Sequence, residues 1–333
     1  MNLSEKYQLA YQFIRTARRL LLVGHTDPDA DALAAIAAVL ETLVPFGAEA
    51  YAFADKKPTD VFSFIPHEER VNVTPPSDLR DFDVILILDC GSIKRTALAE
   101  RLEKLLTLPA ESRPFIIDFD HHQPNKSYAD LEIRLPDKAS TTEIIYEFLK
   151  INGVEINKTA AECILIGLMT DTGHFLYPNS SRAVLKIASE MLLKGASLVK
   201  VISPTVHNKS FGALKLWGRV LEDTQLNPDT GLAVVVLKEK DLATEKVEGE
   251  EDAASLGGEL ASFLASLNGV KVALVLREEE GQVKGSLRTN DKALDVIKIA
   301  QIFGGGGHKK AAGFSLPGRL EKTPTGWKVA RSL

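Results

Sequence analysis

The chain has 333 residues, a formal net charge of −5 at pH 7, 45% apolar residues and 26% charged residues. This length exceeds what one hydrophobic core usually organises, and the acidic balance argues against a protein that binds long duplex nucleic acid through a broad basic surface. Cys90 and Cys163 are its only two cysteines, so neither a disulfide framework nor a zinc finger can form, and a reducing cytoplasm fits.

The N-terminal half alternates apolar strands with helical patterns. Helices are predicted at residues 5–19, 32–44, 141–151, 158–170 and 180–194. Continuous apolar runs predict strands at residues 20–24, 84–89 and 114–118. Because strands apolar throughout suit a parallel sheet covered on both faces, we predict an α/β domain with a mostly parallel sheet over residues 1–195.

Membrane insertion and export are not expected. The first helical pattern has charges too dispersed for a signal peptide. The longest apolar run, residues 32–40, is far shorter than the roughly 20 residues that cross a bilayer.

The C-terminal half predicts a smaller α/β domain. Residues 196–224 read as a connecting loop and helix, which we interpret as a linker. Beyond it, strands are predicted at residues 232–237, 270–276 and 282–288. Residues 245–252 are expected to form a solvated loop, and the second domain is placed at 225–333.

The loop after the first strand carries an imidazole and three carboxylates within seven residues, namely His25, Asp27, Asp29 and Asp31. Such a cluster is costly unless a cation binds it. One alternative is a plain turn in which Asp29 or Asp31 caps the next helix. A calcium loop is a second alternative, but its sixth and twelfth positions are both alanine here, so the EF-hand pattern fails.

Three further chain segments place acids or histidines at the ends of predicted elements. Asp89 ends the second strand, the pair His121 and His122 follows two acids after the third, and Asp171 ends a helix. Taken singly, each could be a cap, a surface loop or an exposed helix end. Together they predict a site for two metal ions bridged by one carboxylate, made of His25, Asp29, Asp31, Asp89, His121 and Asp171.

The ligand types bear on which metal binds. Imidazole mixed with carboxylate favours manganese, iron or cobalt over magnesium, and the absence of cysteine ligands argues against structural zinc. We therefore expect a catalytic pair of divalent ions, with manganese preferred.

A glycine run at residues 304–307, followed by His308 and two lysines, lies near the C-terminus. Glycines let the backbone approach an anion, and Arg288 at a nearby strand end offers another phosphate donor. The run lacks the Lys-Ser/Thr ending of a Walker A loop. We therefore interpret this segment as a clamp that binds the substrate. A flexible loop without a binding role is the alternative.

In this order the motifs resemble those of the DHH phosphoesterases, a family named for an Asp-His-His motif, here residues 120–122. The others appear as GHTDPDAD (24–31), DCG (89–91), TDTG (170–173) and GGGGHKKAAGF (304–314), the last similar to the DHHA1 domain motif. The resemblance covers almost the whole chain and, in length and domain order, is greatest to the NrnA-like nanoRNase/pAp phosphatase group.

The resemblance implies a role for each site residue. The first ion would take His25, Asp29 and Asp89, and the second would take Asp31, Asp89, His121 and Asp171. The catalytic residues would be Asp89, as the bridge, and His122, facing the phosphate under attack. The substrate's other phosphate or sugar would be held by Arg288, Gly306, Gly307 and His308. The alanines after the first motif replace the Gly-Ser pair of relatives, which bears only on local helix packing.

We therefore expect a cytoplasmic two-metal phosphoesterase for short oligoribonucleotides or 3'-phosphoadenosine 5'-phosphate (pAp), with closure of the second domain limiting substrate length. The rivals are a cyclic- or linear-dinucleotide phosphodiesterase, a manganese pyrophosphatase, a RecJ-like exonuclease and a non-catalytic nucleotide-binding regulator. The sequence leaves a homodimer open.

Overall fold

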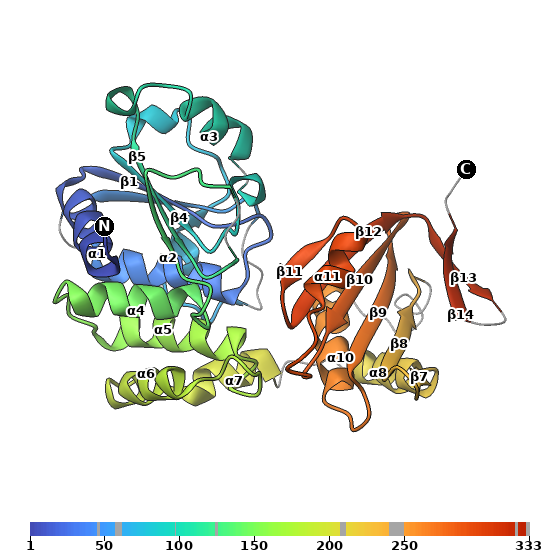
Figure 1. Ribbon diagram of the computed structural model, residues 1–333. Helices are drawn as coiled ribbons and strands as arrows, with labels where there is room; N and C mark the ends of the chain where they lie inside the picture. The colour runs from blue at the N-terminus through green and yellow to red at the C-terminus, as the bar shows by residue number, and fades with distance from the viewer. Residues whose placement is uncertain are drawn as a thin grey trace. The chain divides into compact units, whose positions relative to one another are not determined.

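A computed structural model describes residues 1–44, 47–56, 62–96, 98–123, 126–206, 211–239, 250–323 and 326–330 of the chain, and leaves the His308 side chain undescribed (Figure 1). The chain divides into two compact units, Met1–Asn208 and Lys209–Leu333. Across the described ranges, no helix is both long and apolar enough to span a bilayer.

The first unit is built on a six-stranded sheet in the order β3-β2-β1-β4-β5-β6, with every neighbouring pair parallel. Its strands are β1 (Arg19–Val23), β2 (Glu49–Phe53), β3 (Val71–Asn72), β4 (Val84–Leu88), β5 (Phe115–Asp120) and β6 (Leu131–Arg134). The prediction of a mostly parallel α/β sheet is confirmed. The strands β2, β3 and β6 were not predicted, because they are short or carry charged residues.

Helices cover both faces of this sheet (Figure 1). They are α1 (Leu3–Thr16), α2 (Ala30–Thr42), α3 (Ala99–Leu105), α4 (Thr141–Ile151), α5 (Lys158–Asp171), α6 (Arg182–Leu193) and α7 (Leu198–Val206). Short 3₁₀ turns lie at η3 (Glu68–Arg70), η4 (Leu79–Asp81), η5 (Ile93–Arg95) and η6 (Ala110–Ser112). On β1, Leu20 and Leu22 join the core with α1, α2, α4 and α5, while Leu21 and Val23 face α3. A strand buried on both faces explains the unbroken apolar runs.

The alanine-rich α2 is the central helix of this unit. Ala32, Ala34 and Ala35 have no exposed surface, and the helix packs against both α4 and α5. Small side chains allow these helix backbones to approach closely. The alanines that follow the first motif therefore suit the close packing of α2 against α4 and α5. The N-terminus of α2 and the C-terminus of α5 are thereby held beside the carboxyl ends of the strands.

The second unit has a mixed sheet in the order β11-β12-β10-β9-β8-β7, in which β8 and β9 are parallel and the other pairs antiparallel. Its strands are β7 (Gln225–Asn227), β8 (Leu232–Leu237), β9 (Val272–Glu279), β10 (Gln282–Arg288), β11 (Gly306–His308) and β12 (Ala311–Pro317), with a separate hairpin of β13 (Arg319–Thr323) and β14 (Gly326–Ala330). Its helices are α8 (Phe211–Glu222), α10 (Glu250–Ala265) and α11 (Ile297–Ile302). The predicted smaller α/β unit is confirmed.

The predicted linker and the predicted acidic loop both contain helical residues. Residues 196–224 form α7, which packs on α5 of the first unit, and α8, which packs on β8 of the second. Of the predicted solvated loop at 245–252, residues 245–249 lie outside the described residues, and 250–252 form the first turn of α10. That loop prediction is wrong at its end, because a run of acidic residues also suits a helix N-terminus.

Candidate metal centre

The loop between β1 and α2 buries His25, leaves Asp29 exposed beside it and turns Asp27 to the surface. Asp27 has a positive φ of 52° and pairs with Lys56 at the surface. Asp29 caps α2, because one of its carboxylate oxygens accepts the backbone N–H groups of Asp31 and Ala32, both at 3.1 Å. Its other oxygen lies 3.6 Å from Nε2 of the buried His25. The helix-cap alternative is therefore real, and the same carboxylate also faces the site.

Asp31 lies in the first turn of α2 and is completely buried against the N-terminus of α4. Its two oxygens accept the backbone N–H groups of Thr141 at 2.6 Å and Thr142 at 3.1 Å. These amides belong to the first turn of α4, where the helix leaves N–H groups without internal partners and favours negative charge. The carboxylate fits against α5 only because residue 167 is glycine, since a Cβ there would lie 2.0 Å from an Asp31 oxygen.

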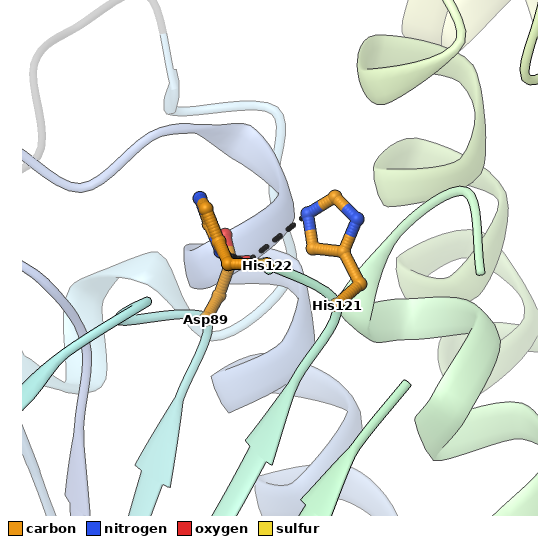
Figure 2. Close-up of side chains that lie close together, drawn as sticks. All are labelled: Asp89, His121 and His122. Carbon is orange, nitrogen blue, oxygen red and sulfur yellow. Dashed lines mark ion pairs between the residues drawn. The ribbon is translucent and has the colours of Figure 1, made fainter. Parts of the chain in front are cut away.

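Asp89 follows β4 and has a left-handed backbone, with φ of 62°. This conformation is uncommon for a residue other than glycine, and it turns the buried carboxylate across the strand end. Its Oδ1 accepts the Thr141 hydroxyl at 2.9 Å and lies 3.4 Å from His121 Nε2 and 3.5 Å from His122 Nδ1. Figure 2 shows the three side chains converging from the ends of β4 and β5. Asp89 is therefore the residue at which the strand ends meet.

Asp171 reaches the same place from the C-terminal end of α5. One of its oxygens lies 3.1 Å from His121 Nε2. The side chain of His121 is 6% exposed. Its ring lies between two carboxylates, those of Asp89 and Asp171. All six predicted ligands are thus brought to one edge of the sheet.

Their potential ligand atoms form three groups whose members all lie within 4.8 Å of one another. The groups are His25 with Asp29 and Asp89; Asp31 with His121 and Asp171; and Asp89 with His121 and His122. The first two match the two expected ligand sets, except that Asp89 is not within the second group. That ions bind there stays a prediction.

Two observations test whether a cation fits. His25 Nε2 is buried and, among the described residues, makes no hydrogen bond. Asp31 and Asp89 are buried beside Asp171, and burial, together with the charges of Asp171 and Asp89, raises the pKa of Asp31 well above its usual value. A divalent ion would satisfy the imidazole nitrogen and neutralise the carboxylates, so the residues fit the metal.

The metal-free site holds protons more tightly than free side chains do. Burial lowers the pKa of His25, but the nearby carboxylate of Asp29 outweighs it and raises that pKa to about 9. Burial, opposed by His121 and helped by Asp89, raises the pKa of Asp171 to about 6. Metal binding must displace these protons.

Asp120 supports the second histidine from behind. Its Oδ1 accepts both the backbone N–H and the Nδ1–H of His122, at 2.9 and 2.7 Å, and its Oδ2 accepts the Gly91 N–H at 2.8 Å. Burial raises the pKa of Asp120, but hydrogen bonding and charge from His122 outweigh it and lower that pKa to about 2. The carboxylate therefore stays charged and orients the imidazole.

A buried ion pair lies below this carboxylate. Arg134 of β6 donates to Asp118 at 2.6 Å and lies 3.6 Å from Asp120, and the Tyr128 hydroxyl donates to Asp118 at 2.7 Å. Burial, followed by the charge of Asp120, raises the pKa of Asp118 to about 7. These contacts hold the end of β5 that carries both histidines.

In the second unit, three neighbouring strands align the predicted substrate residues. Arg288 at the end of β10 and His308 in β11 both pair in register with Ala311 of β12, from opposite sides. Two strand spacings separate their backbones, about 10 Å. The Arg288 guanidinium donates to the Leu287 carbonyl at 3.0 Å and lies near Gly258 of α10. The side chain of His308 lies outside the described part of the chain.

The glycines at 304–307 serve two purposes. A Cβ at Gly305 or Gly307 would lie 2.1 or 2.5 Å from backbone oxygens of β12, so both glycines are required for strand packing. At Gly304 and Gly306 a Cβ would meet nothing within 4 Å, which leaves this backbone open to a ligand. Lys310 turns inward, donating to the carbonyls of Asp291 and Leu294, so it holds the loop.

Comparison with known families agrees with this geometry. The profile of the DHH family, N-terminal domain, matches residues 19–168, and that of the DHHA1 domain matches residues 239–331. The chain belongs to the DHH family. It is accordingly a divalent-metal-dependent phosphoesterase.

Similar proteins span nearly the whole chain. A bifunctional oligoribonuclease and PAP phosphatase NrnA of Thermus thermophilus is 29% identical over 315 residues, covering 94% of this chain and 89% of that protein. The NrnA of Bacillus subtilis is 28% identical over 300 residues, with 89% of each chain covered. The crystal structure of an exopolyphosphatase-related protein from Bacteroides fragilis has a TM-score of 0.84 and 25% identity, covering 95% of this chain and 92% of that chain.

Sequence reasoning missed three residues of the DHH domain. Thr141 contacts both Asp31 and Asp89, Gly167 makes room for Asp31, and Arg95 lies 3.1 Å from His122. The Ser-Thr-Thr-Glu run at residues 140–143 is a helix N-cap signal that could have directed attention to Thr141. Nothing local distinguishes Gly167 or Arg95, since both act through contacts distant in sequence.

Proposed function

We propose that this DHH-family protein is a two-metal phosphoesterase that hydrolyses short oligoribonucleotides and pAp. The observation that carries the proposal is the meeting of two imidazole–carboxylate groups at Asp89. Two ions a few ångströms apart suit phosphoryl chemistry, because they can act on both the attacking and the leaving oxygen. The named activity of the NrnA relatives from Thermus thermophilus and Bacillus subtilis supports the substrate class.

In this proposal the first ion would be held by His25, Asp29 and Asp89. The second ion would be held by Asp31, Asp89, His121 and Asp171, so Asp89 would belong to both ligand sets. The donor set of imidazole and carboxylate suits Mn²⁺. Such ions, when bound, would lower the pKa of an attacking water and neutralise charge on the phosphate.

The protein's own groups position the reaction. The α4 amides hold Asp31, and the Thr141 hydroxyl holds Asp89, so both carboxylates keep one orientation. Asp120 fixes His122 beside Asp89, where the imidazole can contact a phosphate oxygen or the leaving group. His122 is therefore proposed as the catalytic residue outside the ligand set.

We propose that the DHHA1 domain binds the rest of the substrate through Arg288, Gly306, Gly307 and His308. Their register on adjacent strands and the open backbone at Gly306 support this role. A net charge of −5 favours short substrates over long duplexes, which need a broad basic surface. The two free, buried cysteines fit the proposed cytoplasmic location, and a homodimer stays a proposal to be measured.

The test is product release with Mn²⁺ from four compounds: pAp, a labelled five-nucleotide RNA, pyrophosphate and linear di-adenylate. Wild type is compared with Asp89→Asn, which keeps the shape of the side chain and removes its charge, and with His308→Ala. Asp27→Asn is the matched control, since Asp27 lies in the same region but is paired at the surface. We expect Mn²⁺-dependent cleavage of pAp or RNA, lost in Asp89→Asn, weakened in His308→Ala and kept in Asp27→Asn.

Other outcomes distinguish the rivals. Turnover of pyrophosphate alone indicates a pyrophosphatase, and turnover of di-adenylate alone indicates a dinucleotide phosphodiesterase. Tight nucleotide binding without product indicates a regulator. Full activity in Asp89→Asn would refute the two-metal site.

A further inference from the structure

Arg95 lies beside the metal centre but belongs to none of the ligand groups. It ends the η5 turn after β4, and its NH1 lies 3.1 Å from His122 Nε2. Its carbonyl accepts the Thr26 N–H at 2.7 Å, which ties this turn to the β1–α2 loop. Residue 91 is glycine with φ of 68°, and a Cβ there would lie 3.2 Å from Arg95 NH1 and 3.3 Å from the His122 ring. The glycine at residue 91 therefore leaves room for the contact between Arg95 and His122.

The direction of the hydrogen bonds is determined by the partners. A guanidinium can only donate, so His122 Nε2 accepts from Arg95. The charged Asp120 carboxylate can only accept, so His122 Nδ1 carries the hydrogen that it donates. In this state the Nε2 lone pair of His122 accepts from Arg95, so this nitrogen offers no N–H to a substrate. Arg95 is thus the side chain that offers donors there.

Arg95 is placed to receive an anion. It is an exposed residue, and no carboxylate of the described ranges forms an ion pair with it, although several acids lie nearby. With two divalent ions bound, a phosphate between them and Arg95 would be attracted by both.

We propose that Arg95 is a substrate-binding residue that donates to a non-bridging oxygen of the phosphate under attack. This inference rests on the proposed function and names the residue of the DHH domain that recognises the reacting group. The planar guanidinium can give two parallel N–H donors to a phosphate, which an ammonium cannot do. When the phosphate takes these donors, Arg95 leaves His122 Nε2, and that nitrogen is released beside the reacting group.

The test uses the full, Mn²⁺-loaded chain and three variants. Arg95→Gln removes the charge, and Arg95→Lys keeps the charge but not the paired donors. Arg15→Gln is the matched control, because Arg15 is an exposed arginine in the last turn of α1, just before the opposite end of β1. Four quantities are measured: metal content by mass spectrometry, melting temperature, inorganic phosphate binding by calorimetry, and kcat and KM with pAp.

We expect Arg95→Gln to weaken phosphate binding at least about tenfold and to lower kcat/KM about 100-fold, the usual cost of losing one donor to a transition-state oxygen. The phosphate affinity and kcat/KM of Arg95→Lys should lie between those of wild type and Arg95→Gln. Metal content and melting temperature should not change in either variant. Arg15→Gln should stay within about twofold of wild type. In chains loaded with diamagnetic Mg²⁺ in place of Mn²⁺, the nitrogen chemical shifts of His122 should change when phosphate is added to wild type and not when it is added to Arg95→Gln.

The proposal is overturned if Arg95→Gln binds phosphate and turns over pAp as Arg15→Gln does. It is also overturned if Arg95→Gln loses metal or melts early, because Arg95 would then be structural. Phosphate binding needs no turnover. The calorimetric measurement therefore still decides the role of Arg95 if wild type cleaves none of the proposed substrates.

Discussion

Replacing Gly167 with alanine adds a methyl group inside the contact between α2, α4 and α5. The new Cβ would lie 2.0 Å from an Asp31 oxygen, 2.2 Å from the Thr142 hydroxyl and 2.6 Å from the Thr142 methyl. Ordinary contacts are longer than 3.4 Å, so the helices or the carboxylate must move by more than 1 Å. Because Asp31 is buried and held by two α4 amides, that movement breaks hydrogen bonds to a charge.

The cost can be estimated from its parts. Overpacking a core costs about 1–3 kcal/mol, and losing a hydrogen bond to a charged group costs about 1.5–3 kcal/mol. Alanine recovers up to about 1 kcal/mol through its higher helix propensity. The free energy of unfolding of the first unit should therefore fall by roughly 2–5 kcal/mol. The affinity for the second ion should fall as well, by about 10–100-fold, because Asp31 loses its orientation.

Gly218→Ala is the matched control, since Gly218 lies in α8 and a Cβ there would meet nothing within 4 Å. Both tryptophans, Trp217 and Trp327, lie in the second unit, so their fluorescence cannot report on Gly167. Urea denaturation should be followed by circular dichroism, and hydrogen exchange should be measured in α5. Gly167→Ala that unfolds like Gly218→Ala and binds two ions with wild-type affinity would refute the packing argument.

Three further predictions concern the same centre. Thr141→Val removes the hydroxyl that donates to the buried Asp89 at 2.9 Å and keeps the backbone amide, so metal affinity should fall about 10–100-fold in a Mn²⁺ titration, and the free energy of unfolding of the metal-free chain should fall by about 1.5–3 kcal/mol. Asp120→Asn loses a carboxylate that accepts three N–H groups, so kcat should fall about 10–100-fold with metal content unchanged; equal loss of metal would contradict a positioning role. The raised pKa of Asp171, about 6, adds stability to the metal-free fold that is complete below about pH 4 and lost as the pH rises through 6, so denaturation midpoints without metal should fall over that window. Mn²⁺ binding near pH 6 should release protons, measured as a buffer-dependent enthalpy, and no dependence on the buffer would contradict the assigned protonation.

Local sequence was sufficient where one segment carries the whole signal. The runs at β1, β4 and β5 are apolar because both faces of the sheet are covered, and this pattern predicted the parallel α/β domain. Polar residues directly after such strands gather at one sheet edge whatever the packing, which is why five of the six candidate ligands could be named in advance; the sixth, Asp171, ends the helix α5. The short strands β3 and β6 carry no such signal and were missed.

Only the tertiary structure brought in residues whose role depends on a distant partner. Thr141 lies 52 residues from Asp89 and 110 from Asp31, and its amide and hydroxyl become part of the site only when α4 packs against α2. Gly167 matters because a carboxylate from another helix occupies the space of its missing side chain. Arg95 could have been any surface arginine until folding placed it 3.1 Å from His122. Periodicity and strand ends are encoded by neighbours along the chain, whereas these contacts are produced by packing between segments, which no local pattern records.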